Sequence, residues 1–158
     1  MRTKTAPTRV TRPDGKYQSV RIAKLINCVM RDGKKSVAQK QVYLALEDLA
    51  KKTGKKPLES FEDVIKAVSP QMEVRSRRVG GASYQVPMPV RPNRAFALSL
   101  RALVESANKR PSKQYHTFAE KFVAEMLDAL QGVGGAINKK NTAHRMADAN
   151  KAFAHFRW

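Results

Sequence analysis

The sequence is poor in cysteine, in long uncharged stretches and in anything resembling a targeting segment. The one cysteine, Cys28, excludes an internal disulfide and any zinc site built from several thiolates, and it agrees with a reducing compartment. The longest uncharged run, Val79–Val90, has 12 residues and contains glycine and proline, so we predict no membrane-spanning helix. No apolar segment follows the first basic residues, so we predict no secretory signal.

Acidic residues are also few. The 158 residues include 31 Lys and Arg against 13 Asp and Glu, a formal net charge of +18. The hydrophobic content of 42% and the length nevertheless suit a folded chain, and we expect residues 1–158 to form a single domain. A globule with this charge favours a polyanionic partner. Nucleic acid is the first candidate, ahead of an anionic membrane surface or acidic proteins.

The residue patterns that catalysis or metal binding requires are missing from the sequence. There are no paired carboxylates, no Ser-His-Asp order, no dinucleotide-binding glycine turn and no P-loop spacing. His144 and Asp148 lie four residues apart, as an ion pair on a helix would, but a third metal ligand at fixed spacing is lacking. Cys28 lies in an apolar stretch and is interpreted as a small buried hydrophobe. We therefore expect no enzyme, no metal and no cofactor.

Apolar periodicity predicts a mainly α protein, a bundle of about six helices. Ser36 to Gln39 and Thr117 to Glu120 have the spacing of capping boxes, and proline at a helix start costs no hydrogen bond. The last predicted helix has few large apolar residues, which suits loose packing on its own domain and contact with something polar outside. The helical patterns begin at Val20, Ser36, Pro57, Pro92, Thr117 and Asn141, and they end at Asp32, Gly54, Pro70, Pro111, Gly132 and Ala154.

Between the third and fourth helices the period changes to two. Apolar and polar residues alternate on both sides of Gly80-Gly81, which predicts a protruding two-stranded β-hairpin over residues 72–90. Pro87 and Pro89 lack donors along the same strand edge, so that edge cannot recruit another strand. Because a two-stranded ribbon is marginal alone, we expect one of its faces to rest on the helices.

Basic residues are concentrated in separate parts of the chain. Residues 1–16 lack periodicity and are interpreted as a flexible basic arm, with a solubilising tail as the alternative. Residues 71–95 carry five arginines against Glu73, and residues 139–158 form a basic C-terminal helix and tail. Guanidinium groups bind phosphates and stack on bases, so the hairpin is predicted to contact nucleic acid, DNA or RNA; a solvated ribbon face is the alternative.

Two further segments leave two interpretations open. Lys34 and Lys35 precede a helix start, where backbone N–H groups and ammonium groups favour phosphate, but a plain helix-joining loop fits equally well. The chain ends with aromatic residues interleaved with Arg and His, which either stack on bases or pack on the protein. For Phe153 packing is favoured, and for Trp158 the two interpretations are equal.

Several strings of residues are specific enough to indicate a family. In order along nearly the whole chain, the sequence resembles the bacterial small-subunit ribosomal protein S-seven family, whose fold is a bundle of helices with a protruding β-ribbon. A DNA-architectural protein would explain the charge and the hairpin but not these strings, and a free-standing translational repressor would share the RNA chemistry. The matching strings are Asp32–Ser36, Val74–Pro87, Val90–Pro92 and His144–Trp158, with the lead-in Pro13-Asp14.

The resemblance implies a primary binder of the small-subunit (16S) rRNA that nucleates assembly of the 3′ major domain, the head of the subunit. It implies a cytoplasmic protein, monomeric within the ribosome, at the subunit interface near exit-site tRNA and mRNA. Its neighbours would be the ribosomal proteins S-nine and S-eleven. Some members of the family also repress translation of their own operon mRNA.

Residue by residue, the resemblance and the charge pattern together give two expected contact sets. The set expected to bind rRNA is Arg2, Lys4, Arg9, Arg12, Lys34, Lys35, Arg75, Arg77, Arg78, Arg91, Arg94, Lys109 and Arg110. The set expected near tRNA and mRNA is Arg77, Arg78, Gly80, Gly81, Tyr84, Arg145, Lys151, Arg157 and Trp158.

Overall fold

The computed structural model describes residue 6 and residues 10–157 of the chain. These residues form six α-helices, a two-stranded antiparallel sheet and a C-terminal 3₁₀ helix, which confirms the mainly α fold with a hairpin between the third and fourth helices. The elements are α1 (Val20–Val29), α2 (Lys35–Thr53), α3 (Pro57–Val68), β1 (Met72–Val79), β2 (Ala82–Pro89), α4 (Pro92–Lys109), α5 (Phe118–Leu130), α6 (Gly135–Ala149) and η1 (Lys151–Phe156).

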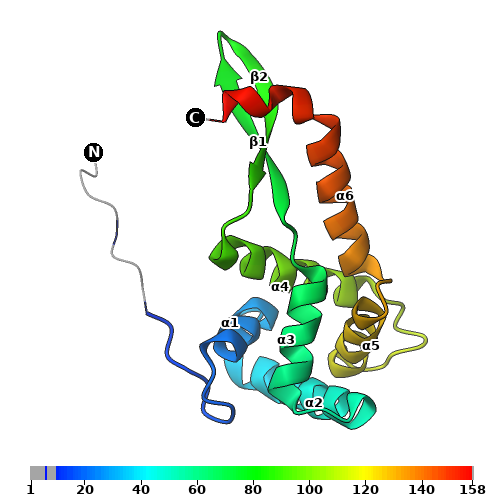
Figure 1. Ribbon diagram of the computed structural model, residues 1–158. Helices are drawn as coiled ribbons and strands as arrows, with labels where there is room; N and C mark the ends of the chain where they lie inside the picture. The colour runs from blue at the N-terminus through cyan, green and yellow to red at the C-terminus, as the bar shows by residue number, and fades with distance from the viewer. Residues whose placement is uncertain (1–5, 7–9, 158) are drawn as a thin grey trace.

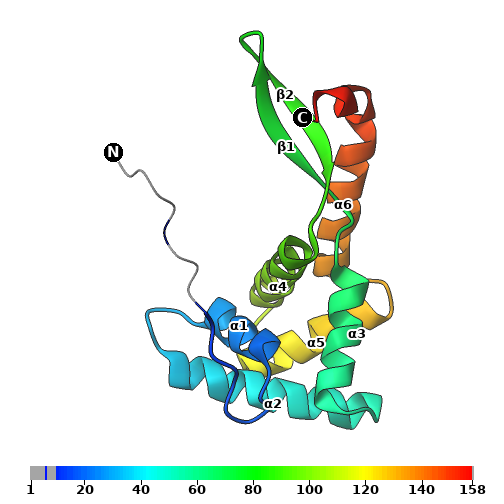
Figure 2. The ribbon, with the colours of Figure 1, turned by 60° about the vertical axis from the view of Figure 1, so that its left-hand side comes forward.

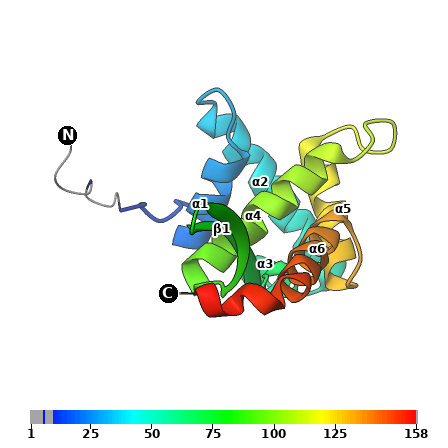
Figure 3. The same ribbon diagram turned by 90° about the horizontal axis from the view of Figure 1, so that it is seen from above.

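The helices α1 to α5 pack into a helical body around one hydrophobic core (Figure 1). Each helix contributes an apolar stripe, and the stripes meet at fully buried side chains such as Leu46 on α2, Phe61 on α3 and Phe122 on α5. Seen from above, α4 crosses over the body between α1 and α5 (Figure 3). This body is the rigid support from which the basic segments extend.

The starts of α3 and α4 and the end of α2 follow the sequence, whereas the start of α2 does not. Pro57 and Pro92 occupy first-turn positions, and Gly54 ends α2 with a φ of 68°. The expected capping box at Ser36 is wrong, because α2 begins at Lys35 and no side chain caps it. The Asp32-Gly33 turn already supplies backbone acceptors there: Lys35 N donates to the Gly33 carbonyl at 2.8 Å.

The predicted capping box of α5 consists of two hydrogen bonds, and one of them forms as predicted. Thr117 Oγ1 accepts from Glu120 N at 3.2 Å, as the capping box requires. The Glu120 carboxylate accepts from the backbone N–H of His116 at 2.9 Å. Thr117 is therefore the N-cap that the pattern predicts, and the Glu120 carboxylate binds the backbone one residue before it.

The last helix begins earlier and ends earlier than the pattern indicated. We expected a helix over 141–154, whereas α6 spans Gly135–Ala149 and a separate 3₁₀ turn follows. The start is fixed by Glu125, which accepts from the N–H of Ala136 at 2.8 Å. A Cβ on Gly135 would lie 2.9 Å from Ser106 Oγ, so only glycine permits this close approach of α6 to α4.

The hairpin projects from the body alongside α6 (Figures 1 and 2). Its register pairs Met72 with Pro89 and Val79 with Ala82, and the two glycines of the turn have φ values of 57° and 90°. A two-residue hairpin turn of type I′ requires positive φ at both positions, so Gly80-Gly81 closes the ribbon without strain. As expected, one face of the hairpin rests on a helix: β1 contacts α6, and β2 contacts η1 and α6.

Candidate nucleic-acid interface

Most acidic side chains are already paired within the chain, and this leaves a group of cations available to a partner. An ion pair inside the chain neutralises a basic side chain, whereas an exposed cation with no such pair can bind an external anion. Within the part of the chain that the structure describes, ion pairs engage the acids Glu47, Asp48, Glu62, Asp63, Glu73, Glu105, Glu125 and Asp128.

The turn between α1 and α2 presents one group of exposed cations. Lys34 and Lys35 are exposed, and so is the preceding Arg31. Among residues 10–157 none of the three side chains forms an ion pair. Figure 2 shows this turn in blue at the left of the helical body, with the hairpin tip at the far end of the molecule. Because the turn is held between two packed helices, the backbone that carries these charges is fixed in place.

The chain that leads into α1 is fastened to the body by a buried aspartate. Asp14 is 6% exposed and accepts from the Tyr43 hydroxyl at 2.7 Å and from the Tyr17 N–H at 3.2 Å. The last residues of the expected arm are therefore held in place, and Arg12, just before them, is exposed. The cations expected at Arg2, Lys4 and Arg9, and the aromatic Trp158, lie outside the described residues.

At the base of the hairpin, one carboxylate holds two arginines. Glu73 accepts from Arg75 Nε at 2.7 Å and from Arg94 Nε at 3.2 Å, which ties β1 to the first turn of α4. Burial raises the pKa of Glu73, but the hydrogen bonds from the two guanidinium groups outweigh it and hold the pKa below its ordinary value of 4.5. Both arginines keep exposed surface, so Glu73 orients them rather than removing them from contact. Sequence patterns gave Glu73 no role, although it is the only acid among five arginines.

The hairpin tip carries the next cations. Arg78 is exposed beside the glycine turn, and Arg77 is half-buried and opposite Tyr84 in the register. Tyr84 itself turns toward the C-terminal segment, where its ring centroid lies 5.3 Å from that of Phe153. The structure thus brings the expected tip residues together and packs the half-buried tyrosine ring against the C-terminal segment.

The C-terminal cations lie along α6 and η1. Arg145, Lys151 and Arg157 are exposed, on the part of the chain that runs beside the hairpin. Phe153 packs on the protein as expected. The expected pair between His144 and Asp148 is not among the contacts of the described residues, because His144 Nε2 instead accepts from the Gln71 N–H at 3.0 Å.

Two expected contact residues lie apart from the rest. Lys109 and Arg110 are at the far end of α4 from Arg91, and 18 residues of helix separate the two ends by about 27 Å. Lys109 and Arg91 are exposed. Arg110 is only 16% exposed and donates to Glu125 Oε2 from Nε at 2.9 Å and from Nη2 at 2.7 Å. Burial lowers the pKa of Arg110, but its bonds to Asp128 and Glu125 outweigh burial and raise it.

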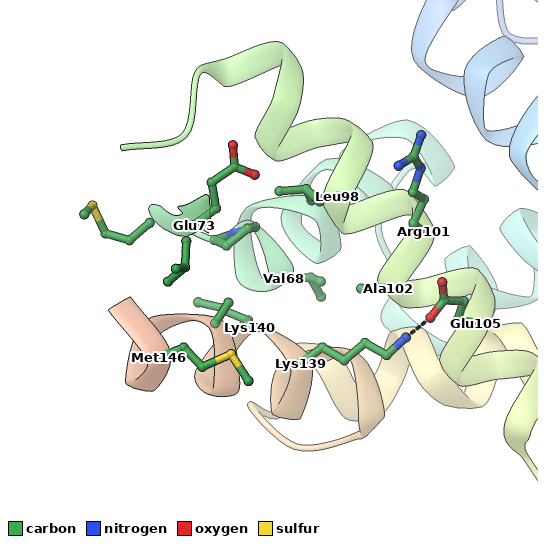
Figure 4. Close-up of a pocket in the computed structure, with 13 residues that line it drawn as sticks. Val68, Glu73, Leu98, Arg101, Ala102, Glu105, Lys139, Lys140 and Met146 are labelled. Carbon is green, nitrogen blue, oxygen red and sulfur yellow. Dashed lines mark hydrogen bonds and ion pairs between the residues drawn. The ribbon is translucent and has the colours of Figure 1, made fainter. Parts of the chain in front are cut away.

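A pocket of about 370 Å³ lies where the hairpin base meets α4 and α6, and nothing in it resembles a catalytic site (Figure 4). Its walls are mainly apolar, and an ion pair between Lys139 and Glu105 stands at its edge. The lining includes no histidine, cysteine, serine or threonine. The described residues contain no group of three His, Cys, Asp or Glu side chains placed to hold a metal ion, and none of their helices is long and apolar enough to cross a membrane.

A helical body with cations at one turn and a projecting Arg-bearing ribbon at the other end is the arrangement of a protein that binds an extended polyanion. Comparison with known proteins identifies the family. The profile of the family described as ribosomal protein S7p/S5e matches residues 1–151. The chain belongs to this family. Its members are structural constituents of the ribosome and not enzymes. This confirms the expected family, the expectation that the chain is not an enzyme, and the RNA-binding class.

Similar curated proteins cover almost the whole chain. A small ribosomal subunit protein uS7 of Caldanaerobacter subterraneus subsp. tengcongensis is 54% identical over 152 residues, covering 96% of both chains. A protein of the same name from Vibrio campbellii is 53% identical over 146 residues, covering 92% of both chains. A third, from Thermodesulfovibrio yellowstonii, is 51% identical over 152 residues, again with 96% of both chains covered.

Proposed function

We propose that this chain binds the small-subunit (16S) rRNA directly and nucleates assembly of the 3′ major domain, the head of the subunit. The family and the names of its relatives already make the chain a structural constituent of the small ribosomal subunit in the cytoplasm. The observation that carries the finer proposal is the division of charge. Most acids form ion pairs within the chain, while the exposed cations Arg31, Lys34 and Lys35 stand at one end of the molecule and the exposed Arg78, Arg145 and Lys151 at the other.

The two ends serve different roles in this proposal. Lys34 and Lys35 sit on a turn fixed between packed helices, so they anchor rRNA together with Arg12, Arg31 and Arg91. A backbone that is already ordered loses little conformational entropy on binding, which favours affinity. We leave Arg110 out of this set because its guanidinium is engaged by two carboxylates of the body.

The hairpin and the C-terminal segment beside it project from the helical body and can contact a ligand beyond it. The hairpin tip with Arg77, Arg78 and the glycine turn, and the segment with Arg145 and Lys151, extend away from the body on one side (Figure 1). We infer that this end approaches exit-site tRNA and mRNA at the subunit interface. The neighbours we propose there are the ribosomal proteins S-nine and S-eleven, as the resemblance implies.

Repression of the chain's own operon mRNA is a second use of the same cations. It requires only an mRNA segment that presents phosphates in the arrangement of the rRNA site, because exposed Lys and Arg bind phosphate in either RNA. An operon leader that displaces rRNA from Lys34 and Lys35 would support this use. A leader that binds equally well to the Lys34→Ala, Lys35→Ala variant would contradict it.

Reconstitution tests the nucleation role. The 3′ domain of the rRNA is folded with and without the chain, and chemical probing reports which helices become protected. We expect protection to appear before any other head protein is added. If the 3′ domain folds identically without the chain, or if the chain joins only after other head proteins, the nucleation role is wrong.

A further inference from the structure

Most packing neighbours of the hairpin lie on the C-terminal side of the chain, and the helical body reaches its base through the pair between Arg94 and Glu73. Figures 1 and 2 both show the strands and α6 leaving the body side by side. The strands contact α6 and η1. A two-stranded ribbon in water is marginal alone, and the Glu73–Arg94 pair holds only its base, so the packing that fixes the rest of the hairpin comes from those two helices.

Two contacts fasten the hairpin along its length. Near the body, the backbone N–H of Gln71 donates to His144 Nε2 on α6 at 3.0 Å. Further out, the ring centroid of Tyr84 on β2 lies 5.3 Å from that of Phe153 and 5.2 Å from that of Phe156, both on η1. These three rings, Tyr84, Phe153 and Phe156, form what we call the aromatic clamp.

The clamp has the geometry of a packed contact. Its two phenylalanine rings stack on each other with centroids 6.5 Å apart, so each ring touches both of the others. Each side chain is half-buried, although the surrounding residues of η1 are exposed. Val86, two residues along the same face of β2, is fully buried. Aromatic pairs at these separations stabilise beyond the area that they bury.

We propose that the aromatic clamp sets the position of the hairpin, so that Tyr84, Phe153 and Phe156 are positioning residues for the ribbon. In the register, Tyr84 faces Arg77. Strand pairs from the base up to this point are held against α6 and η1. Beyond it, only residues 78–83 extend past the clamp, a short tip that presents Arg78 from a fixed support. The C-terminal segment thus determines where the basic tip points.

Hydrogen exchange of the free full-length protein tests this, and its outcome is independent of whether the chain binds RNA. Tyr84→Ala removes two aromatic ring pairs, and we expect the backbone amides of β1 and β2 to exchange roughly threefold to tenfold faster for each ring pair removed. Phe153→Ala should have a similar effect from the other side. Amides of α2 should be unchanged, which separates local release of the hairpin from general destabilisation.

Three comparisons sharpen the result. Tyr84→Phe keeps the ring and should restore wild-type exchange. Tyr115→Ala removes a tyrosine from the α4–α5 loop and should leave the hairpin unchanged. In the double variant Tyr84→Ala, Phe153→Ala, the increase in strand exchange, expressed as a free energy, should be smaller than the sum of the two single effects, because the two residues share a contact. Wild-type strand exchange in Tyr84→Ala, an effect of Tyr84→Phe equal to that of Tyr84→Ala, or full additivity would overturn the proposal.

Discussion

Replacing Glu125 should destabilise the protein more than replacing any surface acid. Its side chain is 2% exposed, and it joins three parts of the fold. One carboxylate oxygen accepts twice from Arg110 at the end of α4, and the other accepts from Ala136 N–H at the start of α6. In Glu125→Ala the guanidinium of Arg110 keeps the carboxylate of Asp128 and a 3.5 Å contact with the Tyr115 hydroxyl, and the buried Ala136 N–H is left without an acceptor.

The magnitude follows from burial. Breaking a buried ion pair from one side costs about 3–5 kcal/mol; Asp128 retains part of this for Arg110, and the unsatisfied Ala136 N–H adds about 1–3 kcal/mol, so a total of about 3–5 kcal/mol is expected. For a chain of this size each kcal/mol lowers the melting temperature by roughly 2–4 °C, so we expect a loss of roughly 6–20 °C. Glu125→Gln keeps an acceptor for Ala136 but removes the charge, and its effect should be intermediate.

Urea unfolding at neutral pH measures the free energy directly. Glu105→Ala is the matched control, because Glu105 also pairs with a basic residue, Lys139, but is 60% exposed. Exposed pairs contribute about 0–1 kcal/mol, so this variant should stay close to the wild type. If Glu125→Ala also stays within about 1 kcal/mol of the wild type at an unchanged m-value, the buried cluster does not hold α4, α5 and α6 together as the geometry indicates.

Three further expectations concern charge. Affinity for the rRNA site should fall steeply with salt, because each phosphate contact adds about 0.7–0.9 to the slope of log affinity against log salt; a slope near zero in filter binding would contradict this. Lys34→Ala with Lys35→Ala should weaken rRNA-fragment binding by about 1–3 kcal/mol, whereas Arg77→Ala with Arg78→Ala should mainly reduce exit-site tRNA retention in assembled subunits; the reverse result would refute the assignment of the two ends. The pKa of Glu73 is lowered in the folded chain, so its stabilisation is present above pH 4.5 and is lost as the pH falls through the folded pKa. Acid titration followed by circular dichroism should therefore show a smaller loss of stability in Glu73→Gln, and an identical titration would contradict the pairing.

The sequence predicted the elements well where the signal is local. Period-two alternation around Gly80-Gly81 predicted the hairpin, and proline at Pro57 and Pro92 marked two helix starts correctly. The start of α6 was missed by six residues, because it depends on Glu125, a residue 11 positions away, and on the fit of a glycine against α4. Neither is visible in a local pattern.

The candidate site was predictable as residue types but not as pairings. Clusters of Lys and Arg can be recognised directly in the sequence. Most of the predicted contact residues that the structure describes are exposed. Which cations are engaged inside the fold depends on long-range contacts: Arg110 meets Glu125 from another helix, and Arg94 meets Glu73 from a strand. The contact between Tyr84 and Phe153 likewise could not be predicted, because about 70 residues separate them and a local pattern does not extend that far.

Competition binding is the most direct test of rRNA recognition by this chain. A labelled fragment of the 3′ major domain of small-subunit rRNA is bound at physiological salt, and unlabelled duplex DNA or an equally long rRNA fragment from another domain is added. We expect neither competitor to displace the labelled fragment until it is present in large excess, because the chain recognises one folded RNA site beyond its general attraction to phosphate. Displacement by equal amounts of either competitor would show that charge alone governs binding, and would contradict the proposed function.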